Sequence, residues 1–355
     1  MRSSQDTLPL VSVLVPAFNA GPWVLEAIQS LLGQRYQRLE VIVVNDASRD
    51  DTLEKLASVR DPRLKVASNP ENRGLIATLN HACALAQGEL LARMDADDRA
   101  LPERLGKQVK TLMSEEDLAV LGTGIRFFSA EENWGHVTRA PLRHPAHSQD
   151  MQATLPFYSS LGHGSAMLRR KILDAIPTKD VFGNPALYDA AFPHAEDYEL
   201  WSRLARSGHK MRSLQEPLQE VRLHRSSVSQ RENVKQREIA DIIRADWRKS
   251  LGLQTSGENF ITHSRLGRLD LPEDPAFLDL TEKCLEELRD ANEKTRLFDP
   301  TAWDKSLSLR WWQACHSVAR RHPGIRTRAI TSRWARGADP GGLRSAKFLV
   351  KTLLG

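Results

Sequence analysis

The sequence of 355 residues has little cysteine and no long apolar run. Its three cysteines, Cys83, Cys284 and Cys315, are far apart, which argues against a zinc cluster or a disulfide framework and fits a reducing cytoplasm. No stretch approaches the roughly 18 uninterrupted apolar residues of a membrane-spanning helix. The N-terminal apolar run lacks the basic flank and long core of a signal peptide, so it is expected to be a first strand. We therefore expect a cytoplasmic globular protein.

Motifs of several common enzyme classes are also missing. The sequence has no Gly-x-Gly-x-x-Gly fingerprint and no Gly-x-x-x-x-Gly-Lys-Ser/Thr loop, which disfavours a dinucleotide oxidoreductase and a P-loop NTPase. It also lacks the Gly-x-Ser-x-Gly elbow of an α/β-hydrolase. The function must be sought in other patterns.

Acidic residues are scarce in the last part of the chain. From Arg310 onward, ten Lys or Arg accompany one acid, Asp339, so this segment carries +9 and, since the whole chain is +5, residues 1–309 carry −4. Basic residues mix there with Trp311, Trp312 and Trp334, and residues 344–354 alternate Lys with apolar side chains. This pattern predicts a short amphipathic helix at an anionic membrane surface. The alternative is packing on the catalytic domain with solvated arginines. Nucleic acid is not expected as a partner, because no recognisable module is present.

The first half of the chain alternates short β-branched runs with helical patterns, as βαβ units do. The expected strands are Leu10–Val15, Glu40–Val44, Arg63–Ala67, Glu89–Arg93, Leu118–Phe128, Gly164–Leu168 and Leu218–Leu223. The expected helices are Trp23–Leu32, Thr52–Val59, Gly74–Ala86, Pro102–Met113 and Ala195–Ser207. The alternation stops after Ser229, which predicts an α/β catalytic domain over 1–229 and a mainly helical, basic region over 230–355.

The most informative stretch is Arg93-Met94-Asp95-Ala96-Asp97-Asp98, which follows an apolar strand. Side chains at i and i+2 of an extended segment project to the same side, so Asp95 and Asp97 can converge on one point. Mg²⁺ or Mn²⁺ binds one or two such carboxylates and completes its shell with substrate phosphates. The alternative is an acidic turn that caps the next helix, and Asp98 is expected to support the site or cap that helix.

Four segments resemble family-2 glycosyltransferases with the nucleotide-sugar-binding GT-A fold. They are VSVLVPAFNAG, VIVVNDASRDDT, NRGLIATLN with LARMDADDRALPERL, and HAEDYELWSRLARSG with EVRLHRSSVS, in the family's order and spacing over residues 10–229. The resemblance implies a Rossmann-like, mostly parallel central sheet with flanking helices. It also implies a metal-dependent enzyme that uses a nucleotide-sugar donor.

The resemblance implies a donor site at the carboxyl ends of the first strands. Asp46 is expected to contact the nucleobase, Asp95 the ribose and metal, and Asp97 the cation itself, while Arg73 at a helix N-terminus attracts donor phosphate. The turn after the first strand would wall the base, and the EVRLHRSSVS loop would close over the phosphates. The candidates there are Pro16, Phe18, Asn19, Arg222 and His224. Ser48, Asp50 and Thr52 are expected to cap the next helix.

An acceptor hydroxyl needs a carboxylate to take its proton. Glu196 and Asp197 begin an amphipathic helix, and the resemblance assigns the base to Asp197; the alternative for this acidic pair is compensation of the helix dipole. Glu196 is expected to be the structural member of the pair, and with His163 it is placed at the acceptor pocket. His144 and His147 are expected in a plain loop.

The sequence therefore predicts an inverting glycosyltransferase that moves a sugar from a nucleotide diphosphate sugar, expected to be a UDP-sugar, by metal-assisted direct displacement. The expected acceptor is a growing bacterial surface glycan or a polyprenyl-linked precursor, at the inner face of the cell membrane. One alternative is a noncatalytic glycan-assembly scaffold that retains the GT-A fold. A nucleotidyltransferase is disfavoured, because Ala17–Pro22 lacks a glycine-rich basic loop.

Overall fold

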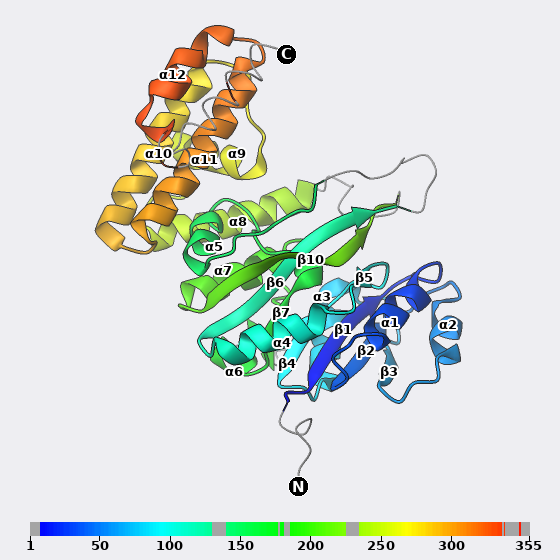
Figure 1. The fold of residues 1–355 in the computed structure, drawn as a ribbon. Helices are drawn as coiled ribbons and strands as arrows, with labels where there is room; N and C mark the ends of the chain where they lie inside the picture. Colours follow the sequence, from blue (N-terminus) through cyan, green and yellow to red (C-terminus); the bar gives the residue numbers. More distant parts are fainter. Residues whose placement is uncertain are drawn as a thin grey trace. The chain divides into compact units, whose positions relative to one another are not determined.

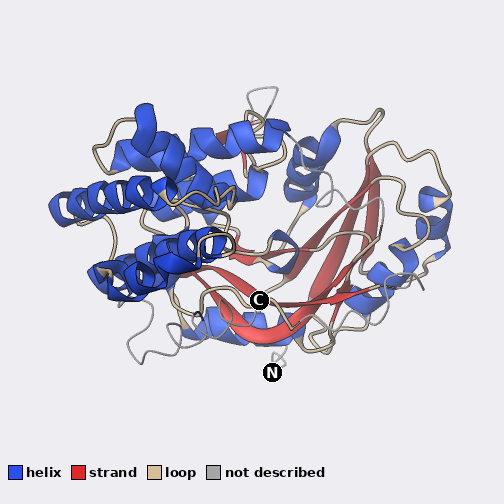
Figure 2. Cartoon of the chain, turned by 90° about the horizontal axis from the view of Figure 1, so that it is seen from above, coloured by secondary structure: helices blue, strands red, loops and turns tan. Residues whose placement is uncertain are grey.

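The computed structural model describes residues 8–129, 140–176, 178–180, 185–224, 234–335, 337 and 348. The chain divides into two compact units, of which unit 1 comprises residues 1–148 and 160–233, and unit 2 comprises residues 149–159 and 234–355. Unit 1 contains the strands, and unit 2 is helical (Figures 1 and 2). The predicted functional boundary at residue 229 stays a prediction; by contacts, residues 149–159 group with the C-terminal helices.

An eight-stranded sheet forms the body of unit 1, in the order β3-β2-β1-β4-β7-β6-β10-β5. The strands are β1 (Val11–Ala17), β2 (Leu39–Asn45), β3 (Leu64–Ser68), β4 (Leu90–Arg93), β5 (Arg99–Ala100), β6 (Leu118–Phe128), β7 (Met167–Arg169) and β10 (Lys210–Arg222). The pairs β1–β2, β2–β3, β1–β4 and β6–β10 are parallel, whereas β7 pairs antiparallel with β4 and β6. A separate pair, β8 (Thr178–Lys179) with β9 (Pro185–Ala186), is antiparallel.

Helices cover both faces of this sheet, since alternate strand residues point to opposite sides. Val11, Val13 and Val15 of β1 share one buried core with apolar residues of α1 (Val24–Leu32) and α4 (Arg104–Ser114). On the other face, α3 (Gly74–Leu85) packs against β1 and β2. The remaining helices of unit 1 are α2 (Thr52–Ser58), α6 (Ile172–Ala175) and α7 (Glu196–Arg206). The α/β class and the flanking helices predicted from sequence are confirmed.

Three neighbouring strands bring the predicted donor residues to one edge. β2, β1 and β4 are adjacent and parallel, so their carboxyl ends, Asn45, Ala17 and Arg93, lie at the same edge of the sheet. Ligands of open α/β sheets bind at such edges. The loops that follow these strands carry Phe18, Asp46 and the acidic cluster.

The last strand of the sheet is longer than its sequence indicates. We predicted a strand over Leu218–Leu223, but β10 spans Lys210–Arg222. Its pairing with β6 is irregular on both sides of Pro217, which has no N–H to donate to the ladder. The predicted strand at Gly164–Leu168 is also partly wrong, because His163–Ser165 form a 3-10 turn and β7 begins only at Met167.

Unit 2 is built from α5 (Ser148–Thr154), α8 (Val234–Ser250), α9 (Gly257–Arg268), α10 (Ala276–Thr295), α11 (Pro300–Ala319) and α12 (Arg326–Thr331). Aromatic rings form part of its core, where Phe298 stacks on Trp303 with centroids 4.5 Å apart and Phe157 lies 6.0 Å from the same indole. Among the described helices, none is both long and apolar enough to cross a membrane.

The tryptophans of the basic region are inside unit 2. Trp311, Trp312 and Trp334 are at most 4% exposed, and the Trp311 and Trp312 indole nitrogens donate to backbone carbonyls. Phe348, within the predicted amphipathic helix, is also buried and its ring lies 4.9 Å from that of His316. The prediction that these aromatic side chains face a membrane is therefore wrong for Trp311, Trp312, Trp334 and Phe348; most of residues 340–355 lie outside the described residues.

Candidate active site

Asp95, Asp97 and Asp98 form a compact acidic cluster directly after β4. One carboxylate oxygen from each lies within 4.8 Å of the others, so the three could share one ion. Hard carboxylate oxygens are the ligands that Mg²⁺ and Mn²⁺ prefer. Burial and the neighbouring Asp95 and Asp97 charges raise the pKa of Asp98 well above its ordinary value. This crowding is what a divalent cation would relieve, so the donor set fits the predicted metal.

The Asp97 side chain is oriented by a residue that lies 127 positions later in the sequence. Its Oδ2 lies 2.9 Å from Nε2 of His224, which follows β10. The His224 ring stacks on Trp23 at the start of α1, with centroids 4.2 Å apart and an interplanar angle of 29°. Trp23, His224 and Asp97 therefore form one continuous contact chain. The sequence placed His224 near the metal or phosphate, and the structure places it against the metal candidate; its loop continues into residues 225–229, outside the described residues.

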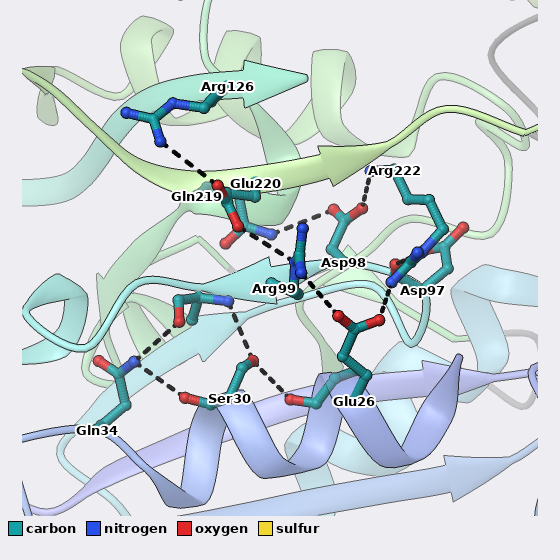
Figure 3. A network of polar contacts seen from close by, with 12 residues as sticks. Glu26, Ser30, Gln34, Asp97, Asp98, Arg99, Arg126, Gln219, Glu220 and Arg222 are labelled. Carbon is teal, nitrogen blue, oxygen red and sulfur yellow. Dashed lines mark hydrogen bonds and ion pairs between the residues drawn. The ribbon is translucent and has the colours of Figure 1, made fainter. Parts of the chain in front are cut away.

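Arg222 and Asp98 join β10 to the acidic loop (Figure 3). The backbone N–H of Arg222 donates to Asp98 Oδ1 at 3.0 Å, and Gln219 Nε2 donates to Asp98 Oδ2 at 3.2 Å. The Arg222 guanidinium donates to the Asp97 carbonyl at 2.9 Å and forms an ion pair with Glu26 of α1. Asp98 does not cap α4, which begins at Arg104. Arg222 and Asp98 therefore hold the acidic loop, residues 95–98, against β10.

The acceptor-side candidates lie next to the same cluster. A Cβ added to Gly164 would lie 3.4 Å from Asp95 Oδ2 and 3.5 Å from Asp98 Oδ2, so the turn that carries His163 approaches both carboxylates. The His163 side chain is 11% exposed, with Nε2 2.8 Å from the Tyr188 hydroxyl and Nδ1 3.8 Å from Glu196 Oε1. The structure thus brings Asp95, His163 and Glu196 into one region.

Desolvation shifts the pKa values of both Glu196 and His163. Burial, followed by the adjacent Asp197 charge, raises the pKa of Glu196 to about 7. Burial and the nearby Arg93 guanidinium hold the pKa of His163 well below its ordinary value, so the imidazole is neutral. The 3.8 Å contact between them is therefore neither a full ion pair nor a hydrogen bond.

Asp197 differs from Glu196 in its access to solvent. Glu196 is 8% exposed, whereas Asp197 lies in the same first turn of α7 and is only half-buried. Asp197 Oδ1 accepts from the N–H of Tyr198 at 2.7 Å, which fixes the carboxylate at the helix N-terminus. Of the two acids, Asp197 is the more exposed to solvent.

The turn after β1 is held by the loop after β2. Ser48 Oγ, Thr52 Oγ1 and Asp50 Oδ2 accept the N–H groups of Asn19, Ala20 and Gly21, respectively, each at 2.9 Å. Asn19 has a positive φ of 50°, as asparagine tolerates. Asp50 also accepts the N–H of Thr52, but the N-cap of α2 is Asp51, which makes no side-chain capping hydrogen bond. The expectation that Ser48, Asp50 and Thr52 cap this helix is therefore wrong, because their oxygens hold the turn after β1 instead. Pro16 pairs within the sheet, and Phe18 is 48% exposed at the strand end.

Asp46 is buried and organises the start of α3. Its Oδ1 accepts the N–H of Arg73 and its Oδ2 the N–H of Gly74, both at 2.9 Å. Asn69 Nδ2 donates to the same carboxylate at 2.8 Å. Gly74 has a φ of +81°, a conformation that glycine adopts without strain. The Arg73 side chain is exposed beside this turn.

Sequence reasoning missed several residues of this site. Trp23, Glu26, Tyr188 and Gln219 contact the predicted residues but belong to none of the acidic or basic motifs. Arg93 belongs to the acidic stretch but was given no role of its own. Arg93 carried a signal, since this basic residue ends β4 two positions before Asp95 and pairs with it. The others required the fold, because up to about two hundred residues separate them from their partners along the chain.

Comparisons with known proteins identify the family of this chain. A model described as "Glycosyl transferase family 2" matches residues 12–176. An uncharacterized glycosyltransferase of Haemophilus influenzae is 31% identical over 251 residues, which cover 68% of this chain and 74% of that protein. The O-antigen biosynthesis glycosyltransferase WbnJ of Escherichia coli is 30% identical over 228 residues, covering 62% and 82%.

The putative glycosyltransferase EpsE of Bacillus subtilis is 33% identical over 217 residues, covering 60% of this chain and 73% of that protein. Among solved structures, S. aureus TarS 1–349 in complex with UDP-GlcNAc aligns with a TM-score of 0.53 and 17% identity, covering 89% of this chain and 92% of that chain. The likeness to TarS bears on the fold, which is GT-A-like. This chain belongs to glycosyltransferase family 2.

Proposed function

We propose that this glycosyltransferase moves one sugar from a nucleotide diphosphate donor to a hydroxyl acceptor, with inversion at the transferred carbon. The observation that carries the proposal is the placement of Asp95, Asp97 and Asp98 at the shared edge of β2, β1 and β4, next to the turn of His163 and Gly164. A charged diphosphate and an acceptor can meet there.

The acceptor side supplies one reachable base. Asp197 takes the proton of the attacking hydroxyl, while buried Glu196 and neutral His163 shape the wall behind it. A single base and no covalent intermediate imply direct displacement, hence inversion.

The donor side is formed by the strand-end loops. Phe18 and the turn Pro16–Asn19 flank the nucleobase, Arg73 binds donor phosphate, and Asp46 shapes the turn that presents Arg73. Arg222 and His224 hold the Asp97 loop. Asp97 and Asp95 would hold Mn²⁺ or Mg²⁺. When bound, such an ion neutralises the charge that develops on the departing diphosphate.

The substrate class is proposed from similarity. TarS binds UDP-GlcNAc, and WbnJ is described as an O-antigen biosynthesis enzyme. We assign this chain a UDP-sugar donor and a surface-glycan or polyprenyl-linked acceptor at the inner face of the membrane. Contact with an anionic lipid surface would then depend on the arginines of the basic region, because Trp311, Trp312, Trp334 and Phe348 are buried.

The test is nucleotide release from a panel of UDP-, GDP- and dTDP-sugars with Mn²⁺ or Mg²⁺ and with an EDTA control. Release from a UDP-sugar that requires metal would support the proposal and identify the sugar. Binding of a nucleotide without release would point to a strict acceptor requirement, to be tested with polyprenyl-linked glycans. Absence of both binding and release would favour the noncatalytic scaffold and overturn the proposal.

A further inference from the structure

One face of α1 holds the chain segment that follows the acidic cluster. Ser30 Oγ accepts the N–H of Ala100 at 3.1 Å, and Gln34, just beyond the helix, donates to the Leu101 carbonyl at 2.8 Å. Glu26 lies one turn before Ser30, and residues four apart share a helix face. Figure 3 shows Glu26, Ser30 and Gln34 in a row along this segment. Glu26 is the member of the row that meets the segment where it leaves the acidic cluster.

Glu26 bridges two arginines that flank the cluster. Its Oε1 accepts from Arg99 at 2.8 Å, and its Oε2 pairs with Arg222. Arg99 directly follows Asp98 in the sequence, whereas Arg222 ends β10. Both guanidiniums also lie over the Phe128 ring, 3.7 Å and 4.4 Å from its centroid. One carboxylate and one ring thus hold the two arginines together.

Arg222 transmits this constraint to Asp97. Its Nε donates to the Asp97 carbonyl at 2.9 Å, and its backbone N–H donates to Asp98 Oδ1 at 3.0 Å. A guanidinium is a rigid planar fork, so a partner that fixes one of its nitrogens fixes the direction of the others. The Glu26 carboxylate on Nη2 therefore sets the direction in which Nε meets the Asp97 carbonyl.

A second contact joins the start of α1 to the same aspartate. The Trp23 indole stacks on His224, whose Nε2 lies 2.9 Å from Asp97 Oδ2. The backbone of Asp97 is thus constrained from α1 through Glu26, and its side chain through Trp23. Both routes begin within the first turn of one helix.

The Glu26 contacts differ from an ordinary surface ion pair. Such pairs often contribute little, and the Glu26 side chain is 44% exposed. However, Glu26 uses both oxygens on two different arginines, and the Arg222 side chain is only 6% exposed. Groups that orient the ligands of a metal typically change its affinity by about 10–100-fold when they are removed.

We propose that Glu26 is a positioning residue for the cation: through Arg222 it fixes Asp97 and the rest of the acidic cluster in the arrangement that accepts Mn²⁺ or Mg²⁺. The inference rests on the proposed function, which gives the cation to this cluster. It also assigns Arg222 to the acidic loop rather than to the donor phosphate, because Glu26 already balances its charge.

Mn²⁺ binding to the full chain without nucleotide tests the inference, because it is measured without catalysis. The protein is stripped of metal with EDTA, which is then removed, and free Mn²⁺ is followed by its EPR signal during titration. Glu26→Gln should raise the Kd about ten-fold and Arg222→Met about 10–100-fold, as loss of orienting groups does. Circular dichroism and Tm show whether each variant is folded.

These two changes separate positioning from simple charge. Glu26→Gln removes a negative charge, which by itself weakens cation binding, whereas Arg222→Met removes a positive charge, which by itself strengthens it. Positioning predicts that both changes weaken binding. The double variant has the net charge of the parent but should bind Mn²⁺ as weakly as Arg222→Met, because Glu26 acts through Arg222. A parental Kd in the double variant, or tighter binding by Arg222→Met, overturns the inference.

Glu103→Gln is the matched control. Glu103 also pairs with an arginine, Arg35, but their side chains are 40% and 77% exposed. The change in charge equals that of Glu26→Gln, so Glu103→Gln should bind Mn²⁺ with the parental Kd. An equal rise of Kd in the two glutamine variants would indicate charge alone and contradict positioning.

Arg222→Lys replaces Arg222→Met if the latter does not fold. The ammonium keeps the charge but lacks the fork that serves both partners, so Arg222→Lys should also weaken Mn²⁺ binding. Parental binding by Arg222→Lys would overturn the inference. A lower Tm of Glu26→Gln without a change in Kd would do the same, since Glu26 would then serve stability alone.

The parent and Asp97→Asn distinguish this inference from the proposed function. Mn²⁺ binding that is lost in Asp97→Asn but unchanged in Glu26→Gln overturns the inference and leaves the proposed function in place. No Mn²⁺ binding by the parent, or equal binding by Asp97→Asn, overturns the metal assignment and the inference with it.

Discussion

Asp97 is fixed by contacts on its side chain and on its backbone. His224 approaches its carboxylate, and the Arg222 guanidinium holds its carbonyl oxygen. Because these contacts fix its position, removing only the charge of Asp97 should remove its ability to hold a cation. We therefore expect Asp97→Asn to fold normally but to lower metal-dependent nucleotide release at least about 100-fold, as removal of a preorganised electrostatic group does. Steady-state release assays measure this.

The control for that variant is Asp117→Asn, which removes an exposed carboxylate that pairs only at the surface with Lys210. Asp117→Asn should release nucleotide at the parental rate. Near-parental turnover in Asp97→Asn would remove this residue from the metal site.

Asp197 and Glu196 are adjacent but differ in exposure, and this difference decides their expected roles. Asp197→Asn should lower kcat for transfer by about 10²–10⁴-fold and leave the donor KM unchanged, since only the proton acceptor is lost. Glu196→Gln should retain most transfer activity, because Glu196 is only 8% exposed. Comparison of the two variants in the same transfer assay is the measurement, and the reverse order would reassign the base.

Glu196 also predicts a pH-dependent stability. Its pKa is about 7 in the folded chain against an ordinary value of 4.5, so the folded state binds the proton more tightly than the unfolded state. The stabilisation that protonated Glu196 gives to the folded state is therefore complete below about pH 4.5, and it is lost as pH rises through about 7. Glu196→Gln should be more stable than the parent by about 1–3 kcal/mol at pH 8, with the difference vanishing near pH 4.5.

Urea unfolding of both proteins at pH 4.5, 6 and 8 measures this difference. A stability difference that does not change with pH would show that the Glu196 pKa is close to its ordinary value.

At the scale of elements, the chain entering the short strand β4 lies very close to the start of β1. Gly88 precedes β4, and a Cβ there would lie 2.6 Å from the Leu10 carbonyl oxygen and 2.7 Å from the Ser12 nitrogen, both backbone atoms that cannot rotate away. Gly88→Ala should therefore destabilise unit 1 by about 1–3 kcal/mol. Chemical denaturation followed by tryptophan fluorescence measures this.

The matched control is Gly106→Ala within α4, where the nearest atom to the added Cβ is 4.0 Å away. That change should be neutral or stabilising by up to about 1 kcal/mol, because alanine favours the helix. Equal destabilisation by both changes would contradict the close approach at Gly88.

Strands with a strong local sequence pattern were predicted with nearly correct bounds, and strands without one were not. β2, with the run Val41-Ile42-Val43-Val44, was found within a residue or two, and β6 was found with its bounds. β10 was found only at its end, because Pro217 interrupts its ladder. Similarly, the sequence motifs indicated Asp95, Asp97 and Glu196, whereas Trp23 and Glu26 lie in an ordinary helix start and contact the site only through the fold.

At the scale of the molecule, residues 149–159 group with the C-terminal helices. A chain that ends at Ser229 keeps Phe157 but loses Trp303 and His263, the rings packed against it. Exposing that side chain costs about 1.5–3 kcal/mol of burial. We expect this shortened chain to unfold at lower temperature and to bind the dye ANS, and the shortened Phe157→Ser variant to bind less dye. Parental Tm and no dye binding would show that residues 1–229 are self-sufficient.

This arrangement also bears on the order of events during synthesis. Phe157 leaves the ribosome with the sheet domain, but Trp303 follows roughly 150 residues later, which at about 5–20 residues per second is about 7–30 s. Until Arg244 of α8 and His263 of α9 emerge, Phe157 lacks the partners of its own unit, and only the arrival of Trp303 completes the set. The nascent chain therefore presents a temporary hydrophobic segment between two parts of a nearly complete sheet, where a chaperone that binds apolar peptides would be expected to engage it.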